Sequence, residues 1–262
     1  MNYYNENDPS AAAWIRELIN RKLVPDGIVD TRSVEDVRPS DLASFTQCHF
    51  FAGIAGWSYA LQLANVPSTT RLWTGSCPCQ PFSQAGEGKG FADERHLWPA
   101  FKWLIQQCAP PVIIGEQVAS KLGREWLAGV RLDLEDMGYA VGAADLCAAS
   151  KAAPYVRQRL FWVANANGKL DSGDDLPASS RPGSIPTIWE SAQILQTGQR
   201  GVNELVARCV TQRVSSYSDA RSLLHGVPAR VVRLRGYGNA IVPQVAAEFI
   251  RAFYETHPED FC

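Results

Sequence analysis

The sequence lacks the features that mark secreted, membrane-spanning or metal-binding proteins. Its longest apolar runs, such as residues 110–115, are far shorter than the ~20 residues that a helix needs to cross a bilayer. Its first residues carry Glu6 and Asp8 but no basic stretch that leads into an apolar one, so we expect no secretory signal. The seven cysteines are scattered without paired Cys-x-x-Cys or histidine spacings, which argues against a disulfide framework and a zinc site. We therefore expect a cytoplasmic protein with neither a metal nor a membrane partner.

A strong overall charge is also missing, but the charges are unevenly distributed. A net charge of −2 and a pI near 6.1 do not by themselves indicate a nucleic-acid partner. Between residues 200 and 235, however, the chain has seven arginines, no lysine and only Glu204 and Asp219 as acids. An Arg-rich segment on a nearly neutral chain predicts a local surface for phosphate groups. A solvated face with incidental arginines is the alternative interpretation.

Strand and helix patterns alternate over residues 46–164. The apolar content of 46% and the length of 262 residues allow one α/β domain with a sizeable core and a small second lobe. The alternation predicts a Rossmann-like, mostly parallel sheet with helices on both faces. The expected strands cover residues 47–51, 71–75, 112–115, 139–146 and 160–164, and the expected helices cover 57–64, 97–108 and 124–137.

The remaining segments flank or follow this domain. Residues 1–45 are predicted to form a helix over 11–21, capped by Asp8, and a connecting arm over 24–45. Residues 165–229 begin with a stretch rich in Gly, Ser, Asp and Pro and are predicted to form a small lobe. Residues 230–262 are predicted to return to the main domain as a closing segment.

Five short motifs follow one another along the chain. They are FFAGIAGW at 50–57, GSCPCQPFS at 75–83, GEQV at 115–118, YVRQRLF at 155–161 and GNAIVPQ at 238–244. In set and order they resemble the DNA cytosine-5 methyltransferase family, which has a glycine-rich cofactor loop, a Pro-Cys-Gln nucleophile loop, a Glu-Asn-Val strand end, a Gln-x-Arg-x-Arg strand and a closing Gly-Asn segment. The resemblance covers roughly residues 46–164 and 230–254.

The resemblance implies methyl transfer from S-adenosylmethionine to carbon 5 of a cytosine flipped out of double-stranded DNA. Carbon 5 is a poor nucleophile, so the Cys79 thiolate would first add to carbon 6 of the ring. Glu116 would donate a proton to ring nitrogen 3, because burial at the end of an apolar strand favours its protonated form. Arg157 and Arg159 share one face of a strand and would hold the base, the carboxylate and a phosphate. Structural ion pairs are the alternative for this carboxylate and for one of the two arginines.

The same resemblance implies a cofactor site and a DNA surface. The cofactor site would consist of Phe51, Ala52, Gly53, Ile54, Gly56, Pro78, Asn239 and Ile241. Residues 86–95 are similar to a mobile loop that closes over DNA, and the 165–229 lobe would read a few neighbouring base pairs. The expected DNA contacts are Gln80, Ser83, Lys89, Arg95, Arg213, Arg230, Arg233 and Arg235. In a bacterial or phage-infected cell such an enzyme would serve restriction–modification, protection of foreign DNA or hypermodification.

One part of the family pattern is not found where the family has it. Its members carry an acidic residue after the second strand, which holds the ribose, and another after the third strand, for the adenine. Only residues 57–74 separate the glycine loop from the nucleophile strand, which is enough for one helix and one turn. The sequence therefore predicts that two strands and a helix of the cofactor half are deleted. His49 also stands where the family has an acid in the first strand.

This departure leaves three hypotheses open. In the first, S-adenosylmethionine is used and residues 1–45 replace the lost contacts, with Glu35, Asp36 or Asp41 as candidates. In the second, the thiol chemistry is kept but a methylene-folate supplies the carbon. In the third, the protein binds DNA without modifying it. An RNA substrate is a further possibility.

Overall fold

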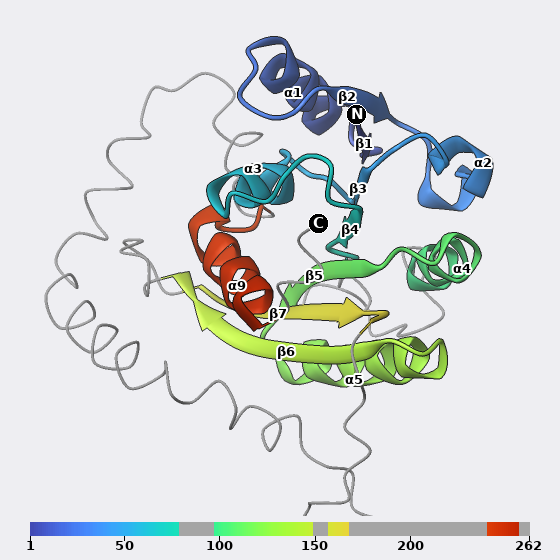
Figure 1. Ribbon diagram of the computed structural model, residues 1–262, viewed down its shortest axis with the longest axis vertical. Helices are drawn as coiled ribbons and strands as arrows, with labels where there is room; N and C mark the ends of the chain where they lie inside the picture. Colours follow the sequence, from blue (N-terminus) through green and yellow to red (C-terminus); the bar gives the residue numbers. More distant parts are fainter. Residues whose placement is uncertain (79–96, 149–156, 168–239, 257–262) are drawn as a thin grey trace, which may run out of the picture.

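The computed structural model describes residues 1–78, 97–148, 157–167 and 240–256, which share a single seven-stranded sheet (Figure 1). The strand order is β2-β1-β3-β4-β5-β7-β6. Every neighbouring pair from β2 to β5 is parallel, whereas β7 is antiparallel to both β5 and β6. The mostly parallel, Rossmann-like sheet is therefore confirmed. The strands are β1 (Asn2–Asn5), β2 (Gly27–Asp30), β3 (Gln47–Phe50), β4 (Leu72–Gly75), β5 (Val112–Val118), β6 (Ala140–Cys147) and β7 (Gln158–Asn165).

Helices cover both faces of the sheet, and side-chain alternation along the strands determines what each face presents. In β3, Cys48 and Phe50 point to one face, whereas His49 between them points to the other. The first face carries the 3-10 helix η1 (Val34–Asp36), α2 (Pro39–Leu42), α4 (Trp98–Cys108) and α5 (Lys121–Asp136). The opposite face carries α1 (Pro9–Asn20), α3 (Gly56–Leu63) and α9 (Pro243–Thr256).

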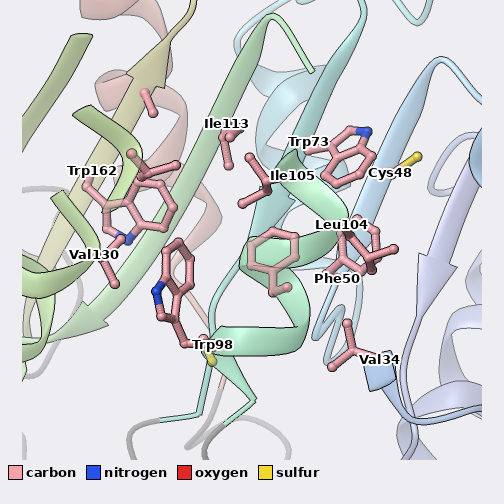
Figure 2. Packing of buried hydrophobic residues seen from close by; sticks show 14 of the residues in the cluster. Val34, Cys48, Phe50, Trp73, Trp98, Leu104, Ile105, Ile113, Val130 and Trp162 are labelled. Carbon is pink, nitrogen blue, oxygen red and sulfur yellow. The ribbon is translucent and has the colours of Figure 1, made fainter. Parts of the chain in front are cut away.

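Aromatic rings fill the core between the sheet and α4 (Figure 2). The Phe50 ring lies 4.9 Å from the ring of Trp73, measured between centroids. Two strand glycines leave room for further rings: a Cβ on Gly75 would lie 2.5 Å from Phe101, and one on Gly115 would lie 2.2 Å from Trp162. Large rings therefore pack against the end of β4 and the middle of β5, where two of the motifs begin.

The elements expected between residues 46 and 164 are confirmed, with shifts of a few residues at their ends. The largest differences are that β5 continues to Val118 and that α5 begins at Lys121. Both differences lie next to the GEQV motif, whose polar residues interrupt the apolar pattern without interrupting the strand.

The predicted absence of two strands between the glycine-loop strand and the nucleophile strand is confirmed, because α3 alone connects β3 to β4, but the conclusion that the cofactor half lacks these strands is wrong. A four-residue strand, β1, precedes α1, and the expected connecting arm over 24–45 contains β2, η1 and α2. The strand β1 pairs with β3 on one side and with β2 on the other, and Tyr4 therefore lies opposite both His49 and Val29. The usual order of a dinucleotide-binding sheet is 3-2-1-4-5-6. Positions 2 and 3 are thus filled here by strands that precede the glycine-loop strand in the chain.

This relocation changes the hand of one connection. From β1 to β2 the chain crosses outward through α1, and from β3 to β4 it crosses the other way through α3. Both helices lie on the same face, since the Tyr4 side chain packs with Ile15 of α1 and its hydroxyl lies 3.0 Å from Ser58 Oγ of α3. Two connections between parallel strands that cross the same face in opposite directions have opposite hands. The connections from β2 to β3 and from β4 to β5 cross in the same direction as that from β3 to β4, but over the other face. The connection through α3 therefore has the opposite hand to the other three.

Candidate functional site

Five segments of the motifs meet at one edge of the sheet. The carboxyl ends of β1, β3, β4 and β5 lie at this edge because these strands are parallel. The antiparallel β7 begins there, with Arg159 opposite Val118 at the end of β5. Ligands of open α/β sheets bind outside the carboxyl ends of the strands. This edge is therefore the candidate site.

A buried ion pair joins the GEQV motif to the arginine motif. Glu116 is only 8% exposed, and its Oε1 lies 2.6 Å from Nε of Arg159. Burial raises the pKa of Glu116 above its usual range, although Arg159 and Arg157 act to lower it. A carboxyl group with a raised pKa stays protonated closer to neutral pH and can therefore donate its proton to a ligand.

Arg157 connects the same strand end to the closing segment. Its Nη2 donates to the Ala240 carbonyl oxygen at 2.8 Å. Both motif arginines line a small pocket with a cavity volume of about 10 Å³, between the end of β6, the start of β7 and the start of α9. The other lining residues are apolar: Leu146, Ala148, Phe161, Val242 and Val245. The two guanidinium groups are thus held beside a hydrophobic wall.

The residues ahead of Cys79 are held from two sides. Ser76 Oγ accepts a hydrogen bond from the Trp57 indole Nε1 at 2.9 Å, and the Cys77 carbonyl oxygen accepts one from Gln117 Nε2 at 3.4 Å. Cys77 is 4% exposed and belongs to the apolar core. Pro78 follows directly and restricts the backbone on both sides of it.

The glycine loop after β3 adopts a strained backbone. Phe51 and Ala55 have φ values of +51° and +61°, and Gly53 has a φ of +57°. Left-handed conformations of non-glycine residues cost about 1–3 kcal/mol each and cluster at ligand sites. A Cβ at Gly53 would meet nothing within 4 Å, whereas one at Gly56 would lie 2.8 Å from Cγ1 of Ile241. The loop is therefore open at its centre and closed at its end by the segment before α9.

An acid that the sequence analysis missed lies beside this loop. Glu6 follows β1, and its Oε2 accepts a hydrogen bond from the Gly53 backbone N–H at 2.6 Å. Burial raises the pKa of Glu6. The signal for it, an acid directly after a strand, was present, but β1 has only four residues and was not recognised.

Of the acids proposed from the sequence as replacements, Asp41 shares Arg32 with Asp30 at the end of β2, whereas Glu35 and Asp36 lie in η1. Asp41 pairs with Arg32 at 2.8 Å, and η1 packs near α4 on the face opposite α3. Asp30, at the end of β2, accepts hydrogen bonds from Tyr3 and Arg32 at 2.7 Å.

The remaining predicted site residues lie outside the described part of the chain. These are Cys79, Gln80, Ser83, Lys89, Arg95, Arg213, Arg230, Arg233, Arg235 and Asn239. The recognition lobe falls there too, except for residues 165–167. Among the described residues, no group of three or more His, Cys, Asp or Glu side chains could hold a metal ion, and no helix is long and apolar enough to cross a membrane.

Comparisons with known proteins find similarity to type II methyltransferases over part of the chain. It is 37% identical over 92 residues to the type II methyltransferase M.AplI of Arthrospira platensis, a match that covers 34% of this chain and 27% of that protein. It is 33% identical over 113 residues to M.NlaX of Neisseria lactamica, covering 42% of this chain and 36% of that protein. The chain thus spans about a third of the length of these relatives. A solved structure of the Schizosaccharomyces pombe Dnmt2 methyltransferase matches with 18% identity and a TM-score of 0.38, over 64% of this chain and 52% of that one.

A family model decides the assignment. The model of the C-5 cytosine-specific DNA methylases matches residues 64–219, which is more than half of the chain. This range contains the nucleophile loop, the GEQV strand end and the arginine motif. The protein belongs to the C-5 cytosine-specific DNA methylase family.

Proposed function

We propose that the protein transfers a methyl group from S-adenosylmethionine to carbon 5 of cytosine in double-stranded DNA. The observation that carries this proposal is the meeting of the buried Glu116–Arg159 pair with the braced segment Ser76–Pro78 at one sheet edge. The next residue, Cys79, is the nucleophile of the family motif. The matched relatives are named type II methyltransferases, which supports a cytoplasmic role in DNA modification such as restriction–modification.

The chain's own residues provide the activation of the base. The Cys79 thiolate forms a bond to carbon 6, and the electrons of the 5,6 double bond move toward ring nitrogen 3. Glu116 supplies the proton that this nitrogen takes up, which leaves carbon 5 electron-rich. The two motif arginines hold the carbonyl side of the ring and keep Glu116 in place. After transfer, carbon 5 loses its proton to water, ring nitrogen 3 returns its proton to the Glu116 carboxylate, and the sulfur departs, which restores the ring and the thiolate.

The residues of the outer half fit the expected cofactor. S-adenosylmethionine, when bound, supplies an electrophilic methyl group. We propose that the open backbone at Gly53 receives it and that Glu6, after the strand in position 2, accepts hydrogen bonds from the ribose hydroxyls. Asp30, the last residue of the strand in position 3, would lie near the adenine. The N-terminal segment would thus supply the contacts to the ribose and the adenine through Glu6 and Asp30.

Incubation of the protein with labelled S-adenosylmethionine and duplex DNA tests this proposal. Label should enter the DNA as 5-methylcytosine, and Cys79→Ser should abolish the transfer. Cys108→Ser is the matched control, since Cys108 is half-buried at the end of α4, on the sheet face opposite α3 and α9.

Three further measurements separate the alternatives: adduct formation, cofactor binding and competition between RNA and duplex DNA. A covalent adduct on 5-fluorocytosine DNA without any binding of S-adenosylmethionine would favour a folate-type donor. Tight DNA binding with neither adduct nor product would leave a non-catalytic relative. If RNA outcompetes duplex DNA as the methyl acceptor, the assignment of DNA as substrate is wrong.

A further inference from the structure

Trp57 touches three parts of the site that are far apart in the sequence. It is the second residue of α3 and follows directly on the strained glycine loop. Its indole N–H donates to Ser76 Oγ at 2.9 Å, three residues before Cys79. Its ring packs edge-on against Phe161 of β7, with centroids 5.9 Å apart. Phe161 lies directly opposite Glu116 in the sheet.

The polar end of this side chain has little freedom. Trp57 is only 3% exposed, and a buried indole N–H without an acceptor would cost about 1–3 kcal/mol. The hydrogen bond to Ser76 removes that cost, so the position of the nucleophile loop and the start of α3 are fixed relative to each other. On the other side, Gln117 holds the Cys77 carbonyl from the end of β5. The segment before Cys79 is therefore held both from the cofactor side and from the side of the acid.

We propose that the Trp57–Ser76 hydrogen bond couples the two halves of the site, so that a ligand in the glycine loop speeds the addition of Cys79 to the target base. Contacts of the ligand to the backbone around Gly53 would restrict the conformation of the loop and thereby the position of the start of α3. The Trp57 side chain would then hold Ser76 in one position through its hydrogen bond. Trp57 and Ser76 are positioning residues, because neither needs to touch the reacting atoms. This inference rests on the proposed function and concerns the regulation of the same site.

Release of tritium from carbon 5 of labelled cytosine in duplex DNA measures the addition step without methyl transfer. The rate of tritium release is compared with and without S-adenosylhomocysteine, which is expected to occupy the cofactor site but has no methyl group to transfer. In the unchanged protein the ligand should accelerate the release. Trp57→Phe and Ser76→Ala should each reduce this acceleration by about five-fold, the factor that one net hydrogen bond contributes. The double variant should lose no more than either single variant, because both remove the same bond.

Two variants separate coupling from a general structural effect. Ser76→Thr keeps the hydroxyl and should keep the acceleration. Trp103→Phe makes the same replacement at a side chain that is 41% exposed on α4, and it should leave the acceleration unchanged. Because coupling is reciprocal, DNA should tighten the binding of S-adenosylhomocysteine by the factor that Trp57→Phe removes.

The outcomes distinguish this inference from the function it rests on. If the unchanged protein releases no tritium at all, the proposed function is wrong and the coupling falls with it. If it releases tritium but the ligand has no effect, or if Trp57→Phe retains the full acceleration, the proposed function stands and the coupling is refuted.

Discussion

The two halves of the sheet reach the same edge by different routes. In the nucleophile half, all four strands from β4 to β7 follow the glycine-loop strand in the chain, and the ion pair of Glu116 and Arg159 joins β5 and β7, which are neighbours in the sheet. In the cofactor half, the outer strands β1 and β2 precede the glycine-loop strand β3, and Glu6 bonds to a residue 47 positions later. The comparison teaches that the position of a strand end in the sheet, and not its order along the chain, places a functional side chain.

The acids of the two halves also differ in their partners. Burial raises the pKa of both Glu6 and Glu116. Glu116 faces a guanidinium, whereas Glu6 accepts hydrogen bonds from backbone N–H groups of Gly53 and Asp8. Under the proposed roles, the acid that donates a proton is buried beside guanidinium groups, whereas the acid that accepts from a neutral hydroxyl group needs only acceptor geometry.

The largest expected effect is on the acid of the nucleophile half. Glu116→Gln removes the proton donor and should lower the methyl transfer rate about 10²–10⁴-fold, the range of general acid catalysis. Binding of S-adenosylhomocysteine, measured by calorimetry, should stay the same. Glu125→Gln, an exposed residue of α5, is the control and should change neither quantity. Equal losses of rate and cofactor affinity in Glu116→Gln would contradict the division between the halves.

The second effect tests the boundary between the halves, where His49 lies. Its ring nitrogens contact Thr74 of β4 and Asn2 of β1, and burial lowers its pKa to about 3. The unfolded chain takes up a proton near pH 6.5 that the folded chain refuses, so this group costs stability as the pH falls from about 6.5 toward 3, by about 1.4 kcal/mol per unit.

Urea unfolding at pH 7 and pH 5 measures this contribution. The unchanged protein should lose about 2 kcal/mol more of its free energy of unfolding between these values than His49→Gln does. Equal losses in the two proteins would show that the His49 ring accepts a proton in the folded state.

The third effect concerns the acid of the cofactor half. Glu6→Gln should weaken the binding of S-adenosylhomocysteine about ten-fold, because a charged acceptor is worth about 1–2 kcal/mol more than a neutral one. The transfer rate at saturating S-adenosylmethionine should change little. Glu17→Gln, on the exposed side of α1, is the matched control for calorimetry. A large loss of rate at saturation would place Glu6 in the chemistry instead of the cofactor site.

The smallest expected effect comes from the glycine loop. Gly53→Ala places a Cβ at a φ of +57° and should reduce the free energy of unfolding by about 1–2 kcal/mol, although the Cβ itself meets no atom. Gly129→Ala, within α5 and equally free of neighbours, should instead stabilise the protein by about 0.5–1 kcal/mol. Thermal unfolding measures both, and a neutral Gly53→Ala would show that the loop relaxes.

The sequence predicted the nucleophile half more fully than the cofactor half for physical reasons. Between residues 46 and 164 the strands β5, β6 and β7 have seven or eight residues, and the four-residue strands β3 and β4 are each followed by a motif that marks where they end. The sequence of β1 is Asn-Tyr-Tyr-Asn, with polar residues at both ends, and β2 is equally short. Their burial depends on neighbours that no local pattern reveals. The buried polar side chains of Asn2, Gln47 and His49 bond to one another across β1 and β3, which hides the strands from a hydrophobicity argument.

Hydrogen–deuterium exchange with and without S-adenosylhomocysteine tests most directly whether the relocated strands form the cofactor half. Amides at the end of β1 around Glu6 and in the loop at residues 51–56 should become protected together when the ligand binds. Protection confined to the loop, with the β1 end and the β2 end unchanged, would contradict the account.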